Sequence, residues 1–269
     1  MAELVPIREE DKQKSYYKYY KNGILPNTPE DFAFVENCKF PTEEGLPFAR
    51  RTEIMQKKRV PAKSGYCELA EGGYMMMSTI PMPNTTGEML SWWMAWHTLD
   101  GLRYSCWNPE DHYDVWLTEE DLARVLDPNV PVPEKTWGIT VHAREMVADT
   151  MNEDATMRFI DPSTVGFDVS RIGTEECPYM TVSRSLLMGI PCLMAGTIGP
   201  SPEDGKMEFR EYFWYGYDIV DGEVVCTLPV GENPGIEMMC KGGILHTRKE
   251  YRHLETFLSK IYAEEKDNW

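Results

Sequence analysis

From residue 66 onward the chain is largely a series of short β-rich runs, and one long helical segment follows them. Gly, Pro or Asp bounds most of these runs, as is typical of strands joined by turns. They are 66–80 (a strand pair turning near Gly72 and Gly73), 136–143, 155–160, 178–184, 190–198, 206–218 and 223–228. Residues 86–97, after the first run, are predicted to be helical instead. The closing segment, 244–264, repeats apolar residues every three or four positions, as an amphipathic helix does. Many antiparallel strands before one such helix predict an α+β fold, a curved antiparallel sheet around a long C-terminal helix.

One predicted strand carries a charge on its apolar face. Alternate residues of 207–217 are large and apolar except for Glu211; they are Met207, Phe209, Phe213, Tyr215 and Tyr217. A sheet that wraps around a helix leaves a cavity between the two, and ligands usually bind in such cavities. We therefore expect the functional site between the sheet and the helix.

The N-terminal residues have a different character. They are more charged and less periodic than the rest, and 9–21, 29–37 and 43–57 are predicted to be short helices. We expect two parts, a mainly helical N-terminal cap over 1–65 and a sheet-and-helix domain over 66–269.

The charge of the chain opposes some classes of partner. Its 269 residues contain 27 Lys and Arg against 44 Asp and Glu, a net charge of −17. Nucleic acids and anionic membranes need clustered cations, so we expect neither as a partner. No apolar run reaches the ~18 residues of a membrane span, and the charged N-terminus lacks the apolar core of a secretion signal.

Familiar cofactor and nucleophile motifs are missing. The seven cysteines include no Cys-x-x-Cys pair, which favours a reducing, cytoplasmic location. There is no Gly-x-Gly-x-x-Gly or phosphate-binding loop, so no nucleotide or organic cofactor is expected. Without a Gly-x-Ser-x-Gly elbow, a serine nucleophile has no support.

Two histidines precede glutamates at short spacings. His142 precedes Glu145, and His246 precedes Glu250 by four residues, which puts the second pair on one face of a helix. Imidazole nitrogens and carboxylate oxygens are ligands of zinc and similar cations. Two His and two Glu from distant segments would form a hydrolytic site if one coordination position stayed open.

Simpler explanations compete with each candidate. Thr247 and Glu250 also fit a helix capping box, and Glu145 fits a surface ion pair with Arg144. His97 follows three tryptophans and favours packing, while His253 continues the His246 face as a neighbour of the ligands or a solvated residue. We keep His142, His253 and His97 as alternative ligands or residues next to them.

Three sequence blocks form a specific pattern. The first is WWMAWHTLDGLRYSCWNPEDHY, from Trp92 to Tyr113, with paired tryptophans, Trp-His, Arg-Tyr, Trp-x-Pro and a closing His-Tyr. The second and third are ITVHAREMV and GGILHTRKEY. In the content, order and similar spacing of these blocks, the chain resembles the 2,4-diacetylphloroglucinol hydrolase and phloretin hydrolase family, over about 66–265.

The resemblance implies a fold and a metal site. The family fold is a helix-grip domain (birch-pollen-allergen-like) with an added N-terminal helical part, usually a homodimer. Its metal, generally taken as zinc, would be held here by His112, Glu145, His246 and Glu250. Iron(II) and manganese also accept these ligands and stay open. Tyr104 would contact the substrate.

The implied reaction is hydrolysis of the carbon–carbon bond between an acyl group and a phloroglucinol ring. This ring can accept a proton on carbon and become a keto tautomer, after which cleavage is a retro-Claisen reaction. Trp93 and Trp107 would supply an apolar wall for the ring, although core packing explains such residues equally well. A non-catalytic protein that binds apolar aromatic ligands is the alternative.

One departure from the family pattern bears on the substrate. The relatives that act on diacetylphloroglucinol use a further histidine between the second and third blocks, and this chain has none between His142 and His246. The departure favours phloretin or a similar acylphloroglucinol as substrate. It also leaves a proton-transfer role open, for which Tyr212 and Tyr215 are predicted, with Tyr217 as a substrate contact.

Overall fold

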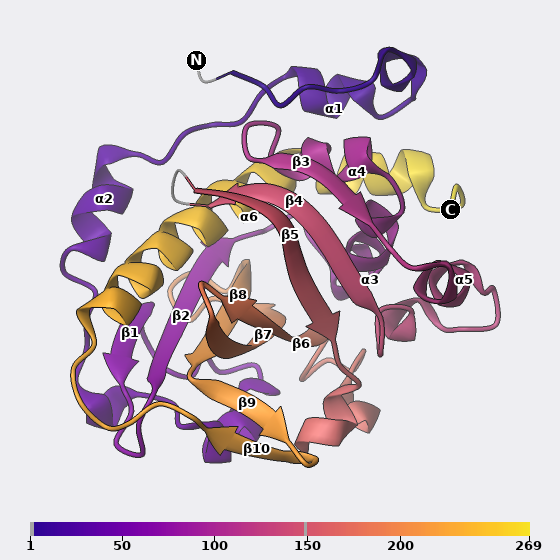
Figure 1. Ribbon diagram of the computed structural model, residues 1–269. Helices are drawn as coiled ribbons and strands as arrows, with labels where there is room; N and C mark the ends of the chain where they lie inside the picture. The colour runs from indigo at the N-terminus through magenta and orange to yellow at the C-terminus, as the bar shows by residue number, and fades with distance from the viewer. Residues whose placement is uncertain (1–2, 148–149) are drawn as a thin grey trace.

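The computed structural model describes residues 3–147 and 150–269, and a large antiparallel sheet forms its centre (Figure 1). Within the described residues this sheet has eight strands in the order β1-β2-β8-β7-β6-β5-β4-β3. They are β1 (Gly65–Glu68), β2 (Tyr74–Pro81), β3 (His112–Trp116), β4 (Thr140–Val147), β5 (Thr150–Phe159), β6 (Met180–Leu187), β7 (Ile190–Pro200) and β8 (Met207–Tyr215). The strand pair predicted over 66–80 is confirmed as β1 and β2, paired antiparallel.

A small hairpin follows β8. The single strand predicted over 206–218 is divided at Gly216, whose φ of 88° suits a residue without a side chain. Beyond it, β9 (Tyr217–Val220) pairs with β10 (Glu223–Cys226) in a separate sheet. Tyr217 therefore leaves the face that it was predicted to share with Phe213 and Tyr215.

The helix α6 (Pro234–Glu265) packs against one face of the sheet, mainly over β1, β2 and β8 (Figure 1). It begins ten residues earlier than predicted, because the Asn233 side chain accepts from the Gly235 and Ile236 amides and Pro234 occupies the first turn. Glu250 thus lies mid-helix, and the interpretation of Glu250 as a capping residue is wrong.

A glycine inside α6 marks the closest approach of the helix to the sheet. A Cβ atom at Gly243 would lie 3.0 Å from Met76 Sδ and 3.2 Å from Tyr215 Oη. Packing of the helix on the sheet therefore requires a residue without a side chain at Gly243.

The two faces of the sheet have different covers. On the concave face, toward α6, Phe209 stacks on Tyr251 with ring centroids 3.9 Å apart. On the opposite face, Trp214 Nε1 donates to the Leu46 carbonyl at 2.8 Å. That cover consists of loops with two 3-10 helices, η2 (Thr42–Glu44) and η3 (Phe48–Ile54), so the helix predicted over 43–57 is present only as these short pieces. Its apolar side chains pack there without a regular helix.

The first residues pack on the same core as the C-terminal helix. They form η1 (Glu9–Gln13), α1 (Tyr17–Lys21) and α2 (Pro29–Val35), so the helix predicted over 9–21 is interrupted. Tyr19 stacks on Phe257 of α6, with ring centroids 5.1 Å apart. The boundary between a cap and a second domain at residue 65 stays a prediction.

Helical segments connect the strands at one end of the sheet. The helix predicted over 86–97 is confirmed as α3 (Gly87–Trp96), which runs into η4 (His97–Leu99). The sequence did not predict α4 (Gly101–Trp107), β3 or α5 (Glu119–Leu126). The remaining short turns are η5 (Val132–Glu134), η6 (Pro162–Val165) and η7 (Val169–Arg171).

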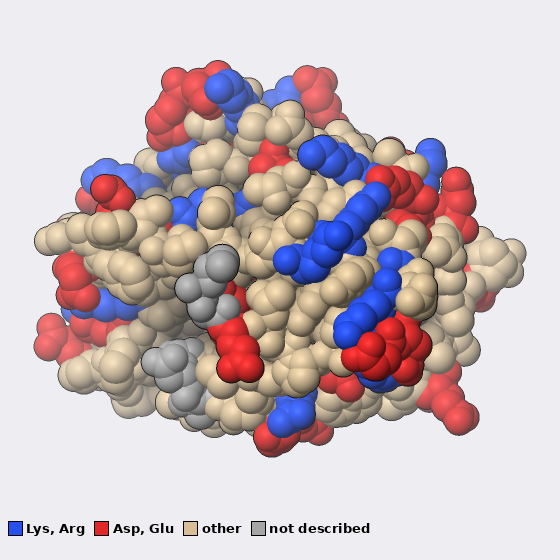
Figure 2. Space-filling view, turned by 90° about the horizontal axis from the view of Figure 1, so that it is seen from above, with Lys and Arg blue, Asp and Glu red and all other residues tan. Residues whose placement is uncertain are grey.

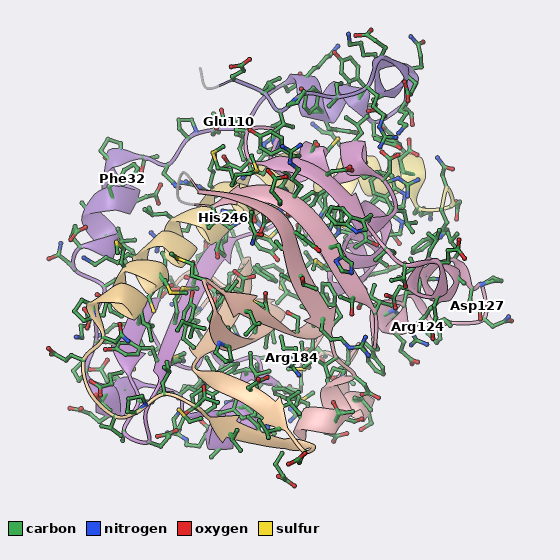
Figure 3. All side chains as sticks on the ribbon, in the orientation of Figure 1. Phe32, Glu110, Arg124, Asp127, Arg184 and His246 are labelled. Carbon is green, nitrogen blue, oxygen red and sulfur yellow. The ribbon has the colours of Figure 1, made fainter. Side chains whose placement is uncertain are left out.

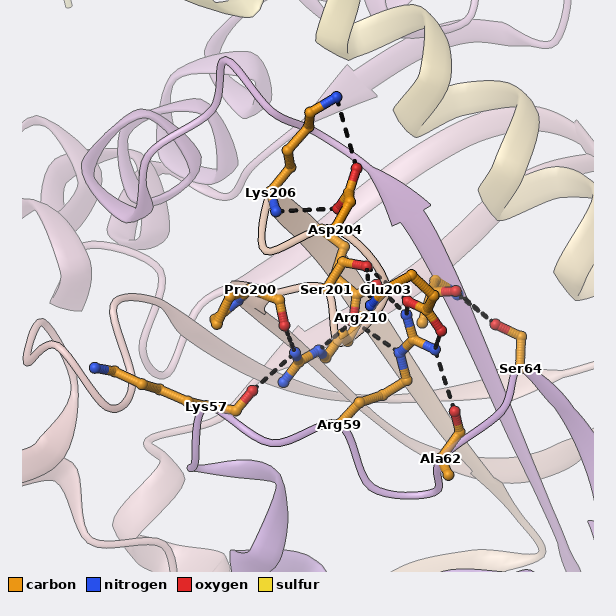
Figure 4. Close-up of polar contacts among 12 residues, drawn as sticks. Lys57, Arg59, Ala62, Ser64, Pro200, Ser201, Glu203, Asp204, Lys206 and Arg210 are labelled. Atoms are coloured by element: carbon orange, nitrogen blue, oxygen red, sulfur yellow. Dashed lines mark hydrogen bonds and ion pairs between the residues drawn. The ribbon is translucent and has the colours of Figure 1, made fainter.

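A group of charges, here called the arginine cluster, lies on the face of the sheet away from α6, buried except for Glu203 at its edge (Figure 4). It consists of Arg59, Glu203, Glu208 and Arg210. Arg59 binds Glu208 through Nε at 2.8 Å and Nη2 at 2.5 Å, and Arg210 Nε lies 2.8 Å from Glu208 Oε1. Arg210 also donates to the Lys57 and Pro200 carbonyls, so the cluster ties the N-terminal cover to β7 and β8.

The surface seen in Figure 2 carries acidic and basic side chains in small, interspersed groups. No helix among the described residues is long and apolar enough to cross a membrane.

Candidate metal centre

Three side chains from distant parts of the chain meet on the concave face of the sheet. One ligand atom from each of His112, His246 and Glu250 lies within 4.8 Å of the other two. His112 begins β3, whereas His246 and Glu250 are one turn apart on α6, as the spacing of four predicted. Figure 3 labels His246 on α6, near the ends of β4 and β5.

Both imidazoles point at the same carboxylate oxygen. His112 Nε2 lies 2.6 Å and His246 Nε2 2.9 Å from Glu250 Oε1. The Nδ1 of His112 lies 3.2 Å from the Tyr104 carbonyl, which can only accept, so Nδ1 carries a hydrogen. The Nε2 atom is thus the one available to a cation, and a second contact fixes the ring orientation, as metal-binding histidines require.

The charges at this point are those of the Glu250 carboxylate and of two imidazoles, and no Lys or Arg of the described residues is paired with Glu250. Burial alone would raise the pKa of Glu250, but His246 and His112 outweigh burial and hold that pKa well below its usual range. Burial alone would lower the pKa of His246, but the Glu250 carboxylate raises it to about 9. The carboxylate therefore stays ionised and draws positive charge toward itself, which is the condition for binding a divalent cation.

The predicted fourth ligand, Glu145, lies beside the three. His112 and Glu145 are cross-strand partners on β3 and β4, and Glu145 Oε2 is 3.8 Å from His112 Nε2. The Tyr104 hydroxyl donates to Glu145 Oε2, and the Tyr104 ring stacks on His112 with centroids 3.8 Å apart. Burial, followed by the Glu145 charge, raises the pKa of Tyr104 well above its usual value, so the hydroxyl keeps its proton.

The loop before β3 is held to α6 by polar contacts that the sequence did not reveal. Asn108 Nδ2 donates to Asp111 at 2.9 Å and approaches Glu250 Oε1 at 3.4 Å. Lys249 Nζ lies 2.8 Å from Asp111 and 3.0 Å from Glu110. The only signal for these contacts was the Trp-x-Pro block that contains the loop.

Of the two tryptophans predicted to contact the substrate, Trp107 lies beside the candidate metal centre and Trp93 lies in the core. Trp107 packs edge-on against His112, with ring centroids 5.7 Å apart. Trp93 is completely buried and packs against Trp107, so its predicted substrate contact is corrected to core packing. His97 is also buried, with Nδ1 2.7 Å from the Trp93 carbonyl, and stacks on the far side of Tyr104. Burial lowers the pKa of His97 to about 4, so it supports the site as a neutral ring.

The three predicted tyrosines are separated. Tyr212 lies in the apolar cluster on the opposite face of the sheet with Trp214, so its prediction as a proton donor is corrected. Tyr217 lies in that cluster as well, and its hydroxyl donates to Glu71 at 3.1 Å, so its predicted substrate contact is corrected too. Tyr215 faces α6 near Gly243, and its role stays a prediction.

Two further histidines lie away from the centre. His142 points to the outer side of β4, where it contacts Asp154 at 2.8 Å and stacks on Trp116. His253 is buried against Phe257, two turns along α6 from His246. Neither ring belongs to the group of converging ligand atoms.

Sequence reasoning noted Glu211 only as an interruption of an apolar face. In the structure it projects from β8 toward α6, and the Thr247 hydroxyl donates to its Oε2 at 2.6 Å. Thr247 directly follows His246, so this acid lies next to the three converging residues. The charged residue in an otherwise apolar strand face was the signal that would have found it.

Comparisons with known proteins agree with the sequence blocks. A family model described as the DAPG hydrolase PhiG domain matches residues 46–263, beginning within the predicted N-terminal part. Phloretin hydrolase from Eubacterium ramulus is 35% identical over 271 positions, which cover 98% of this chain and 95% of that protein. The 2,4-diacetylphloroglucinol hydrolase of Pseudomonas protegens is 23% identical, over 94% of this chain and 85% of that enzyme. A second one, from a Pseudomonas species, is also 23% identical.

Proposed function

Because this chain belongs to the DAPG hydrolase family, we propose that it hydrolyses the carbon–carbon bond between an acyl group and a phloroglucinol ring. The observation that carries the proposal is the convergence of His112, His246 and Glu250 on one point of the concave face. Phloretin is the first substrate to test, since the phloretin hydrolase is 35% identical and the diacetylphloroglucinol hydrolases are 23% identical. The missing histidine between His142 and His246 favours the same choice.

We also propose that a divalent cation, with zinc the first choice, binds at this point. The donor set is two imidazole nitrogens and one carboxylate oxygen, and Glu145 is the adjacent carboxylate for a fourth position. Zinc prefers such ligands, and iron(II) and manganese also accept them. A bound cation of this kind lowers the pKa of water and polarises a carbonyl oxygen.

The protein's own groups have separate tasks in the reaction. His112, His246 and Glu250 hold the cation, and Tyr104 keeps Glu145 in place by a hydrogen bond from its protonated hydroxyl. Trp107 offers an apolar edge beside His112, suited to an aromatic ring. Cleavage requires a hydroxide to add to the acyl carbonyl carbon and a proton to reach the ring carbon.

The test combines elemental analysis of the purified protein with a phloretin cleavage assay. We expect about one equivalent of a divalent metal per chain, and phloroglucinol with 3-(4-hydroxyphenyl)propanoate as products. Removing the metal with a chelator should abolish cleavage, and adding zinc should restore it. A metal-free protein that binds phloretin without cleaving it would instead be a carrier of apolar aromatic ligands.

Three further expectations belong to the same proposal. We propose the helix-grip class for the fold, supported by the large antiparallel sheet with α6 on one face. A homodimer is proposed from the family resemblance and is tested by sedimentation of the purified chain. A cytoplasmic location is proposed from the cysteines, none of which is paired with another among the described residues.

A further inference from the structure

Glu211 is an interior acid that forms no ion pair in the described part of the chain. On the concave face Glu250 lies against two imidazoles, and Glu145 accepts from Tyr104 beside His112. Glu211 accepts from the Thr247 hydroxyl, and the charge of His246 acts on it only from a distance. An acid in such surroundings is stabilised in its protonated form, because burial penalises the charge.

The neighbours of Glu211 on the sheet are small or apolar. Its cross-strand partners are Ser78 on β2 and Gly196 on β7, and the residues two positions before and after it are Phe209 and Phe213. Its side chain is nonetheless partly exposed, and so are Phe213 on the same face and His246 on α6. Glu211, Phe213 and His246 are therefore reached by solvent on this face, beside the candidate metal centre.

The charge environment agrees with this geometry. Burial raises the pKa of Glu211 to about 7; the Glu250 charge also raises it, whereas the hydrogen bond from Thr247 and the charge of His246 lower it. The titratable groups that share this environment are His246, Glu250 and Tyr251 on α6, Tyr215 on β8, Cys192 on β7 and Tyr179 before β6. A carboxyl group held by one hydrogen bond, from the residue next to His246, is placed to pass a proton to a molecule at the candidate metal centre, as a general acid must.

We propose, on the basis of the proposed function, that Glu211 delivers the proton to the ring carbon that bears the acyl group. From the ring phenolate, that carbon takes the Glu211 proton and the ring becomes a neutral dienone. The hydroxide part of one water molecule then adds to the acyl carbonyl carbon. The ring–acyl bond breaks, its electron pair restores the phenolate, and the remaining proton of the water returns to the Glu211 carboxylate. The sum is one acylphloroglucinol and one water to one carboxylic acid and one phloroglucinol.

The test compares Glu211→Gln with wild type. The glutamine carbonyl can still accept from Thr247, so the variant removes the transferable proton and keeps the hydrogen bond. We expect a fall in kcat of roughly 10²- to 10⁴-fold, with unchanged metal content and unchanged affinity for phloroglucinol. Glu211→Asp, which restores an acid, should recover part of the activity. Ser78→Ala is the packing control, since Ser78 lies beside Glu211 without a hydrogen bond to it.

A second readout does not depend on cleavage. In D₂O, the wild-type enzyme should exchange the ring hydrogens of phloroglucinol faster than buffer does, because the same acid operates in reverse, and Glu211→Gln should not. A Gln variant that cleaves and exchanges like wild type would overturn the role of Glu211 alone. A wild-type enzyme that cleaves neither phloretin nor diacetylphloroglucinol would overturn the proposed function, and the role of Glu211 with it.

Discussion

Two buried groups of charges lie on opposite faces of the same sheet, and they are balanced in different ways. In the arginine cluster, Glu208 is bound by two guanidinium groups, which stay charged at any pH the fold survives. At the candidate metal centre, Glu250 faces two imidazoles whose charge depends on a proton. Both groups therefore contain a buried glutamate. They differ in its partners, which are guanidinium groups in the arginine cluster and imidazoles, which can also bind a metal, at the candidate metal centre.

The same difference leaves no free place for a ligand in the arginine cluster. There Arg59 and Arg210 donate to the Glu208 carboxylate and to the carbonyls of Ala62, Lys57 and Pro200. At the candidate metal centre, the proposed cation would bind where His112 Nε2 and His246 Nε2 face Glu250 Oε1. The comparison therefore predicts opposite responses when one charged member of each group is removed.

The largest effect is expected at the metal centre. Glu250→Gln should lose the metal and lower kcat/KM by about 10³-fold or more, because metal catalysis supplies several kcal/mol of transition-state stabilisation. His112→Ala, His246→Ala and Glu145→Ala should act in the same direction. Elemental analysis and circular dichroism of each variant check the loss of metal and the retained fold. A metal-replete, active Glu250→Gln would remove the distinction between the two clusters.

In the arginine cluster, removing a charged side chain should lower the stability of the fold. Arg59→Met leaves Glu208 with only Arg210 and should lower the free energy of unfolding by about 3–5 kcal/mol, the usual cost of breaking a buried ion pair. Urea denaturation measures it, and the folded variant should keep its metal. An unchanged midpoint together with lost metal would mean that the two clusters are coupled through the sheet.

Glu211 extends the comparison to an acid that forms no ion pair in the described part of the chain. Its pKa of about 7 exceeds the ordinary value of 4.5, so the folded protein holds this proton more tightly than the unfolded chain does. The contribution of Glu211 to stability therefore falls as pH rises from about 4.5 to 7. Relative to wild type, Glu211→Gln should gain on the order of 3 kcal/mol over this range, at about 1.36 kcal/mol per pKa unit. Denaturation of both proteins at several pH values checks it; a constant difference would contradict the argument.

The smallest effect is expected from a residue that acts through a ligand. Tyr104→Phe removes the hydroxyl that donates to Glu145 and keeps the ring stacked on His112. We expect metal affinity to fall by about 10- to 100-fold, as is typical when a hydrogen-bond partner of a ligand is lost. Titration against a competing chelator measures this change. Equal affinities would leave Tyr104 with a substrate-binding role only.

The sequence predicted the parts of the molecule that follow local periodicity. β1 and β2 were found as a β-rich run with a turn at Gly72 and Gly73, α3 was found as a helical segment, and the helical spacing of His246 and Glu250 is present. The start of α6 was missed because a glycine needed for tertiary packing resembles a helix boundary. Tyr217 was misplaced because of the break at Gly216, which no local pattern reveals, whereas the alternation of β8 itself places Tyr212 on the face opposite Phe213.

The meeting of His112 with α6 was a different kind of inference. Nothing in its own segment points to a residue more than 130 positions away, and only the family resemblance connected the two. Glu211 was visible in the sequence as an odd residue, but its meaning depends on Thr247 lying opposite.

The contact of Gly243 with Met76 and Tyr215 is a point about which α6 can pivot on the sheet. At about 1.5 Å per residue, His246 and Glu250 lie roughly 5 and 10 Å from this point toward the C-terminus of the helix. Ile236 lies about 10 Å from it toward the N-terminus. Substitutions around Ile236 would tilt the helix and shift both ligands without touching them. The far end of α6 is thus a place where evolution or a designer could tune metal affinity while every residue of the centre stays the same.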